Sequence, residues 1–224
     1  MSFNYGFNEA TYAEVRNLIQ PGDVIAFAGT GFGSWWIQMC SKANVNHVAT
    51  VLKRHTSSEA DRYDLEVIES VFHRDGFSGV RTIIASELIN NYPGKVWWLP
   101  LGKIERAKLN SNIDLFYRCM LRQKGKDFDF TTAALSVFDQ FDRIGWTYAE
   151  EDFSRFFCAE LVAFGLEQCG VLQPLNASEV TPIDMCRFSI YDDFYVLIHD
   201  HPEAGNIVKE IKGFNTTDEG GWGM

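Results

Sequence analysis

Five short runs of apolar and β-branched residues lie in the first hundred residues, and they constrain the fold more than any other feature of the chain. The first run, residues 24–28, is apolar throughout and is bounded by turn residues, which predicts a buried strand. Further strands are predicted over residues 45–52, 65–71, 80–84, 95–99 and 191–198. Helical periodicity is found over residues 8–18, 104–123 and 156–169. Strands in the middle of the chain with helices on both sides predict an α+β fold.

The composition is typical of one compact domain. The 224 residues include 18 Phe, 8 Tyr and 6 Trp, which supply enough apolar surface for a sizeable core. We expect a single domain over residues 1–212. The aromatic and acidic stretch 131–156 fits a lid or substrate-side insertion, or else a packed subdomain. The Gly-rich end, residues 213–224, is predicted to be a flexible tail.

Charge and cysteine content exclude several classes of function. The net charge of −10 argues against binding to nucleic acid or to an anionic membrane, since both need clustered cations. No apolar run is long enough to span a bilayer, and residues 1–20 do not resemble a secretory signal, so a cytoplasmic protein is expected. The five cysteines are odd in number and lack C-x-x-C spacing, which predicts reduced thiols.

Two motifs suggest a cofactor or a metal but lack the residues that such sites need. The glycines of residues 29–33 run G-x-G-x-G rather than G-x-G-x-x-G, and Lys53 and Arg54 stand where a dinucleotide site needs an acidic residue. His199 and His201 flank Asp200, but no third and fourth metal ligand is evident, so this segment is interpreted as a solvated surface turn. The sequence predicts no cofactor and no metal.

Two residues have a context that suits nucleophilic chemistry. His47 lies within an apolar strand, where a polar imidazole needs a partner or a function. Cys158 is predicted in the first turn of a helix, whose N–H groups and dipole stabilise a thiolate. If the two side chains lie within reach, they form a nucleophile and its base, with the Cys158 N–H as a candidate oxyanion donor. Taken singly, each residue fits a packing role better.

Five local signatures occur in a fixed order over residues 22–162. The chain matches G-D-[ILV]-[ILV]-x-F at 22–27, S-H-V-[GA]-x-V at 46–51 in all but its first residue, V-[IV]-E-[AS] at 67–70 with a Gly-Val pair at 79–80, G-K-x-[YF]-D at 125–129, and C-[SA]-E-L-[VI] at 158–162. In these signatures it resembles the permuted NlpC/P60 cysteine peptidases, the YiiX-like group of papain-like proteins. It departs from their pattern at Asn46, Phe128 and Ala159, where Ser, Tyr and Ser are usual.

The resemblance implies a circularly permuted papain-like fold, in which a central antiparallel sheet packs against helices, and a cysteine peptidase or amidase activity. It implies that Cys158 is the nucleophile, His47 the base, and Glu69 the third member that orients the imidazole. Substrate-binding candidates are Trp35, Phe128 and Asp129. The implied substrate is an amide bond in a cell-wall-type peptide.

Two other functions remain open at this stage. The same superfamily includes lecithin:retinol acyltransferase-like proteins, so the site also fits a lipid acylhydrolase or acyltransferase, with Trp35, Trp36, Trp97 and Trp98 as candidates for lining an acyl groove. The other alternative is a non-catalytic binding or structural module. His73 follows Glu69 by four residues and is a second candidate for the base. The remaining cysteines are interpreted as packing thiols: Cys40, Cys119, Cys169 and Cys186.

Overall fold

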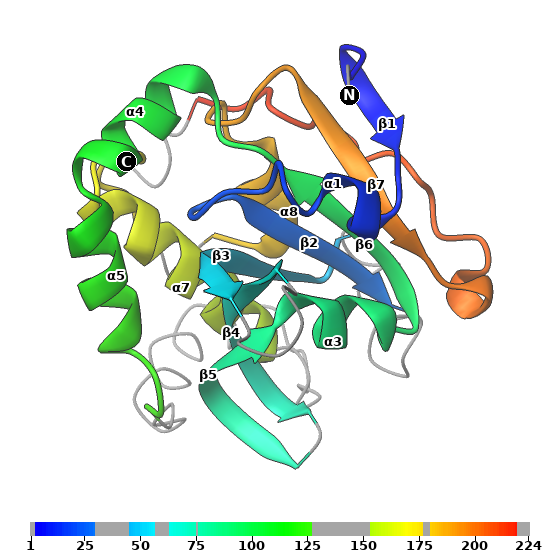
Figure 1. Ribbon diagram of the computed structural model, residues 1–224, viewed down its shortest axis with the longest axis horizontal. Helices are drawn as coiled ribbons and strands as arrows, with labels where there is room; N and C mark the ends of the chain where they lie inside the picture. Colours follow the sequence, from blue (N-terminus) through cyan, green and yellow to red (C-terminus); the bar gives the residue numbers. More distant parts are fainter. Residues whose placement is uncertain are drawn as a thin grey trace, which may run out of the picture.

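The computed structural model describes residues 3–29, 45–56, 63–74, 76–126, 153–176 and 180–218, and the statements below concern these residues. Within them, seven strands form one sheet in the order β1-β7-β6-β2-β3-β4-β5 (Figure 1). Neighbouring strands run antiparallel except β1 and β7, which are parallel. The α+β class is therefore confirmed, although the sheet is mixed rather than wholly antiparallel as expected.

The elements follow the predicted order, with all six predicted strands present and β1 as an addition. The strands are β1 (Gly6–Glu9), β2 (Val24–Gly29), β3 (His47–Thr56), β4 (Tyr63–Arg74), β5 (Phe77–Ile84), β6 (Gly94–Leu99) and β7 (Phe194–Asp200). The helices are α1 (Tyr12–Val15), α3 (Ala85–Asn90), α4 (Lys103–Ser111), α5 (Ile113–Leu121), α7 (Phe153–Gln168) and α8 (Pro182–Arg187), with a 3-10 turn η3 (Pro202–Ala204).

Two of the predicted helices differ from the observed ones. The helix expected over residues 8–18 is a single turn, α1, because Thr11 and Glu14 form a capping box that starts it late. The helix expected over 104–123 is divided at Asn112 into α4 and α5. The Asn112 amide donates to the carbonyl oxygens of Lys108 and Cys169, so this residue ends α4 and ties the chain to the end of α7.

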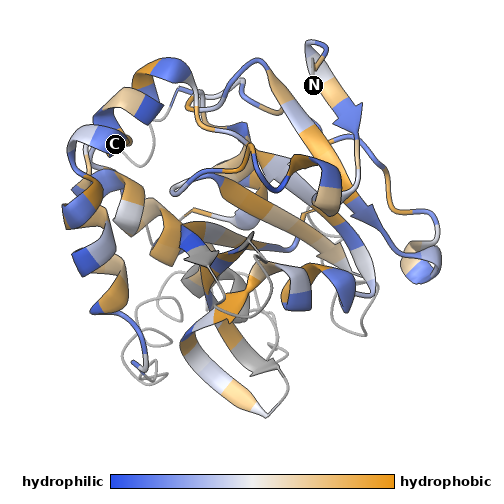
Figure 2. Ribbon diagram, viewed as in Figure 1, coloured by the Kyte–Doolittle hydropathy of each residue, from blue (hydrophilic) through white to orange (hydrophobic). Residues whose placement is uncertain are grey.

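Both faces of the central strands are covered. On β2, the side chains of Val24, Ala26 and Ala28 pack with those of α5, α7 and α8, whereas Ile25 and Phe27 pack with those of α1 and α3. This arrangement explains why the β2 segment is apolar throughout, since strands that alternate in polarity have one solvated face. Figure 2 shows β2 as hydrophobic along its length, whereas α4 carries mostly hydrophilic residues.

Helix α7 is the element that positions the site on this sheet. It packs against β3 and β4, and α5 and α8 pack against it in turn. Close packing with α5 depends on Gly165, where an added Cβ would lie 2.4 Å from the Met120 sulfur. No described helix is long and apolar enough to cross a membrane.

The first part of the expected flexible tail is packed. The Phe214 ring lies against the rings of Tyr191 and Tyr195, with centroid distances of 5.5 Å and 4.5 Å. The Asn215 side chain donates to the Tyr191 carbonyl and accepts from the Tyr191 N–H. The aromatic and amide side chains of residues 214 and 215 thus have partners at Tyr191, before β7, and at Tyr195 within β7. Residues 219–224 lie outside the described part.

Candidate active site

His47 is the first residue of β3, and its strand neighbours fix the position of its ring. It pairs with Phe27 of β2, and the two ring centroids are 5.3 Å apart. The preceding residue, Asn46, accepts a hydrogen bond of 3.4 Å from the Tyr92 hydroxyl, whose ring packs on Phe27. The His47 side chain is 14% exposed, so its ring is largely enclosed but keeps some contact with solvent.

Glu69 on β4 is fully buried and contacts the imidazole. Its Oε2 lies 2.8 Å from His47 Nε2, and its side chain is 0% exposed. A buried carboxylate at this distance accepts the Nε2–H of the ring, which leaves Nδ1 as the nitrogen that faces Cys158. The second carboxylate oxygen, Oε1, accepts a hydrogen bond of 2.9 Å from the Nε of Arg81 on β5. Arg81 was not singled out from the sequence.

Cys158 is buried on α7 and interacts with His47. Its thiol and the imidazole are joined by a side-chain hydrogen bond. The predicted helix start is wrong, however, because α7 begins at Phe153 and Cys158 is its sixth residue. The dipole effect fades within the first turn, and the first four N–H groups alone lack partners within a helix. Stabilisation of a Cys158 thiolate therefore falls to His47, and the helix position does not support the Cys158 N–H as an oxyanion donor.

The charge on His47 is set by its two acidic neighbours. Burial by itself lowers the pKa of His47, but the charge and hydrogen bond of Cys158, together with the hydrogen bond and charge of Glu69, raise this pKa to about 9. The imidazole is therefore protonated at neutral pH. An imidazole that lies between a cysteine sulfur and a carboxylate is the arrangement that a Cys–His nucleophile pair needs.

Cys169 and Cys186 lie in environments that keep their thiols protonated. Burial raises the pKa of Cys169 to about 11, with a further contribution from Cys119. Burial also raises the pKa of Cys186, whose Sγ lies 3.2 Å from the Pro182 carbonyl oxygen. These contacts agree with the packing role predicted for both residues. Cys40 lies outside the described residues.

The sequence signatures also meet at a second point near the site. The Gly125 N–H donates to the Val80 carbonyl oxygen at 2.9 Å, so the start of the G-K signature pairs with the Gly-Val pair on β5. The substrate-binding candidates Trp35, Phe128 and Asp129, and most of the expected insertion 131–156, lie outside the described residues. The same holds for Trp36 and for the side chain of His73.

Trp97 and Trp98 do not line an open groove. Both side chains are buried in β6. Trp97 Nε1 donates to the Lys209 carbonyl oxygen at 2.7 Å, and Trp98 Nε1 donates to Asp23 at 2.9 Å. The expectation that this pair contributes to an acyl groove is therefore wrong, because both rings are part of the core and their polar atoms have partners there.

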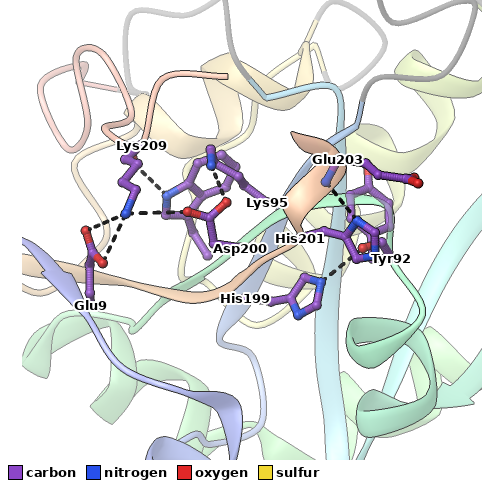
Figure 3. Close-up of polar contacts among 9 residues, drawn as sticks. Glu9, Tyr92, Lys95, His199, Asp200, His201, Glu203 and Lys209 are labelled. Carbon is purple, nitrogen blue, oxygen red and sulfur yellow. Dashed lines mark hydrogen bonds and ion pairs between the residues drawn. The ribbon is translucent and has the colours of Figure 1, made fainter. Parts of the chain in front are cut away.

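The His-Asp-His segment forms structural contacts at the end of β7 (Figure 3). His199 Nε2 lies 3.0 Å from the Tyr92 carbonyl oxygen, and Asp200 pairs with Lys95 and Lys209. His201 Nδ1 accepts from the Glu203 N–H at 3.2 Å and caps η3. Among the described residues, no cluster of His, Cys, Asp or Glu side chains could hold a metal ion.

The chain was also compared with known proteins. Neither the models of protein families nor the curated protein sequences gave a match to this chain.

Proposed function

We propose that this chain is a cysteine hydrolase with a circularly permuted papain-like fold, in which Cys158 attacks an amide carbonyl. The observation that supports this proposal is the continuous contact from Cys158 on α7 through His47 on β3 to Glu69 on β4. Three signature residues from distant parts of the sequence meet there in the order nucleophile, base and orienting carboxylate. In this chain His47 precedes Cys158, which is the order expected after a circular permutation.

The chemistry follows from the charges at the site. The Cys158 thiolate forms a bond to the carbonyl carbon, and the carbonyl π electrons move to its oxygen. The C–N bond then breaks as the amine takes the proton held by His47, which leaves a thioester on Cys158. Water gives its proton to the now neutral His47, and its oxygen forms a bond to the thioester carbon. The C–S bond then breaks, which releases the acid and restores the Cys158 thiolate beside the protonated His47. Glu69 holds the imidazole in one orientation through both steps.

A peptide of cell-wall type is the proposed substrate, and the signatures that the chain shares with the permuted NlpC/P60 peptidases support it. A lipid acyl substrate has less support. Trp97 and Trp98 were candidates for lining an acyl groove, but both are core residues.

Thiol reactivity tests the proposed function without a known substrate. With limiting iodoacetamide at pH 7, we expect Cys158 to be alkylated before Cys119, Cys169 and Cys186, as mapped by mass spectrometry of tryptic peptides. His47→Ala should slow Cys158 alkylation by at least about tenfold, because the thiolate loses its imidazolium partner.

His199→Ala is the matched control, since it also removes an imidazole from a strand end of the same sheet. It should leave the Cys158 rate within about twofold of the wild-type value, because His199 bonds only a backbone carbonyl in the described contacts. Equal rates for Cys158 in the wild type and in His47→Ala would overturn the proposal and favour a binding or structural module.

A further inference from the structure

We infer that Arg81 is a positioning residue of this site, which acts on His47 through Glu69. The inference rests on the proposed function, and it adds a fourth member to the Cys158–His47–Glu69 series. Arg81 lies directly opposite Glu69 in the β4–β5 ladder, and its Nε donates to Glu69 Oε1 at 2.9 Å. One carboxylate oxygen of Glu69 therefore contacts the imidazole of His47, and the other accepts a hydrogen bond from the guanidinium of Arg81.

The two hydrogen bonds fix the orientation of the Glu69 carboxylate. A carboxylate bonded through one oxygen can rotate about its terminal torsion, which is broad for Glu. Bonds from His47 to Oε2 and from Arg81 to Oε1 define the plane of the group and keep Oε2 directed at the imidazole. A glutamine at this position has one oxygen and could accept from only one of the two donors.

The charges at the site also support a positioning role for Arg81. An ionised carboxylate that is 0% exposed carries a large desolvation cost unless cations pair with it. With Arg81 present, the buried carboxylate lies between two cations, the imidazolium of His47 and the guanidinium of Arg81. Without it, the buried carboxylate is balanced by His47 alone and is driven towards protonation, and a neutral Glu69 no longer favours the imidazolium.

The Arg81 side chain is itself held in place. Its guanidinium carbon lies 5.8 Å from the centroid of the Phe77 ring, which is a cation–π contact at the tip of the β4–β5 hairpin. Its side chain is 17% exposed, so most of it is shielded from solvent. A fixed planar donor suits a role in orienting Glu69, and Lys lacks the Nε–H that makes this bond.

The same contact would also be explained by a purely structural role, in which the pair holds the hairpin together. The positioning role and the structural role predict different effects of Arg81 on Cys158. A positioning residue affects Cys158 only while Glu69 is present, so its effect disappears in a Glu69→Ala background. A pair that only holds the hairpin together lowers stability when either partner is lost, but it leaves the pH profile of Cys158 alkylation in the folded protein unchanged.

We therefore propose to measure the rate of Cys158 alkylation by iodoacetamide between pH 6 and 10 in a set of variants. Arg81→Met should lower the rate at pH 7 by about ten- to a hundredfold, the range typical of a lost supporting partner. It should also move the alkaline end of the pH profile to lower pH, because His47 loses its proton more easily. Arg81→Lys keeps the positive charge and should therefore lower the rate of Cys158 alkylation less than Arg81→Met does. In the Glu69→Ala background, Arg81→Met should change the rate by less than about twofold.

Arg106→Met is the matched control for burial and charge. Arg106 is 14% exposed and pairs with the buried Asp23, so its loss disturbs stability as the loss of Arg81 does. At a temperature at which circular dichroism shows all variants folded, Arg106→Met should keep the wild-type Cys158 rate within about twofold. If Arg81→Met does not fold, Arg81→Lys and its Glu69→Ala double variant decide the question.

The outcomes separate the two proposals. If wild-type alkylation does not depend on His47, the proposed function fails and the role of Arg81 fails with it. If it depends on His47 but is unchanged or faster in Arg81→Met, or if the Arg81 effect persists in Glu69→Ala, the inference alone is overturned.

Discussion

The proton on His47 controls the proposed site at the scale of single residues. The pKa of His47 is raised from 6.5 to about 9, so the ring keeps its proton at neutral pH and loses it as the pH rises through that value. Because the leaving amine needs this proton, kcat/KM for a cleaved peptide should fall above about pH 9.

Glu69→Ala supplies the internal check on this pH dependence. Its hydrogen bond and charge both raise the pKa of His47, so their loss should move the alkaline limb of the profile to lower pH. Profiles of kcat/KM recorded from pH 6 to 11 for the wild type and for Glu69→Ala measure the displacement. An alkaline limb that stays at the same pH in the variant would show that Glu69 does not set the charge of His47.

The sequence indicates three of the four residues that contact one another at the site. The fourth, Arg81, could not be identified because a β-bulge changes the register between β4 and β5. His47, Glu69 and Cys158 stand within recognisable signatures. Counting back from the Arg74–Phe77 pair would place Thr82 opposite Glu69. An irregularity between Val71 and Arg74 shifts the register by one residue, so Arg81 occupies that position instead. Local sequence does not reveal such a shift.

At the scale of elements, the long apolar strands were predicted well and the short helices were not. The β2 segment is unambiguous because it is apolar and is bounded by turn residues on both sides. Helices α3 and α8 have six residues each, which is too short for a helical period to be recognised. The start of α7 was placed too late, because residues 153–155 lie before the periodic pattern from which the helix was predicted.

Asp23 joins several elements, and its removal should be costly. Its carboxylate accepts from the Gln20 N–H, Trp98 Nε1 and the Leu101 N–H, and it pairs with Arg106 of α4. Asp23→Ala leaves these donors without their acceptor and removes the carboxylate that balances the charge of the largely buried Arg106 guanidinium. We therefore expect the free energy of unfolding to fall by about 3–5 kcal/mol, as measured by urea unfolding with circular dichroism.

Glu9→Ala is the control for Asp23→Ala. Glu9 pairs with Lys209 with both side chains about half exposed, so its loss should cost no more than about 1 kcal/mol. The Cys158 alkylation rate in folded Asp23→Ala should match that of the wild type, because Asp23 has no described contact with the site. A loss below about 1 kcal/mol for Asp23→Ala would show that this carboxylate does not hold the elements together.

At the scale of the whole molecule, the site and the Lys95–Asp200–Lys209 cluster occupy different parts of the sheet. The site uses β3, β4 and β5 with α7, whereas the cluster of Figure 3 lies around β6 and β7. The sequence predicted the other six strands but neither β1 nor this order, because the pairing of β6 with β2 and of β1 with β7 joins segments distant in the chain. Long-range pairing depends on how the surfaces pack rather than on local pattern.

The net charge of −10 and the buried tryptophans favour a peptide substrate over a lipid acyl chain. Anionic membrane surfaces repel an acidic protein, and the Trp97 and Trp98 rings offer no surface to an acyl group. An enzyme that buries the acyl chain gains about 0.8 kcal/mol, or roughly fourfold in kcat/KM, for each methylene. With p-nitrophenyl esters from acetyl to decanoyl, we expect kcat/KM to vary by less than about tenfold over the whole series. Cys158→Ala gives the background rate to subtract. A steady rise near fourfold per methylene would instead identify an acyl-binding groove and favour the lipid acylhydrolase.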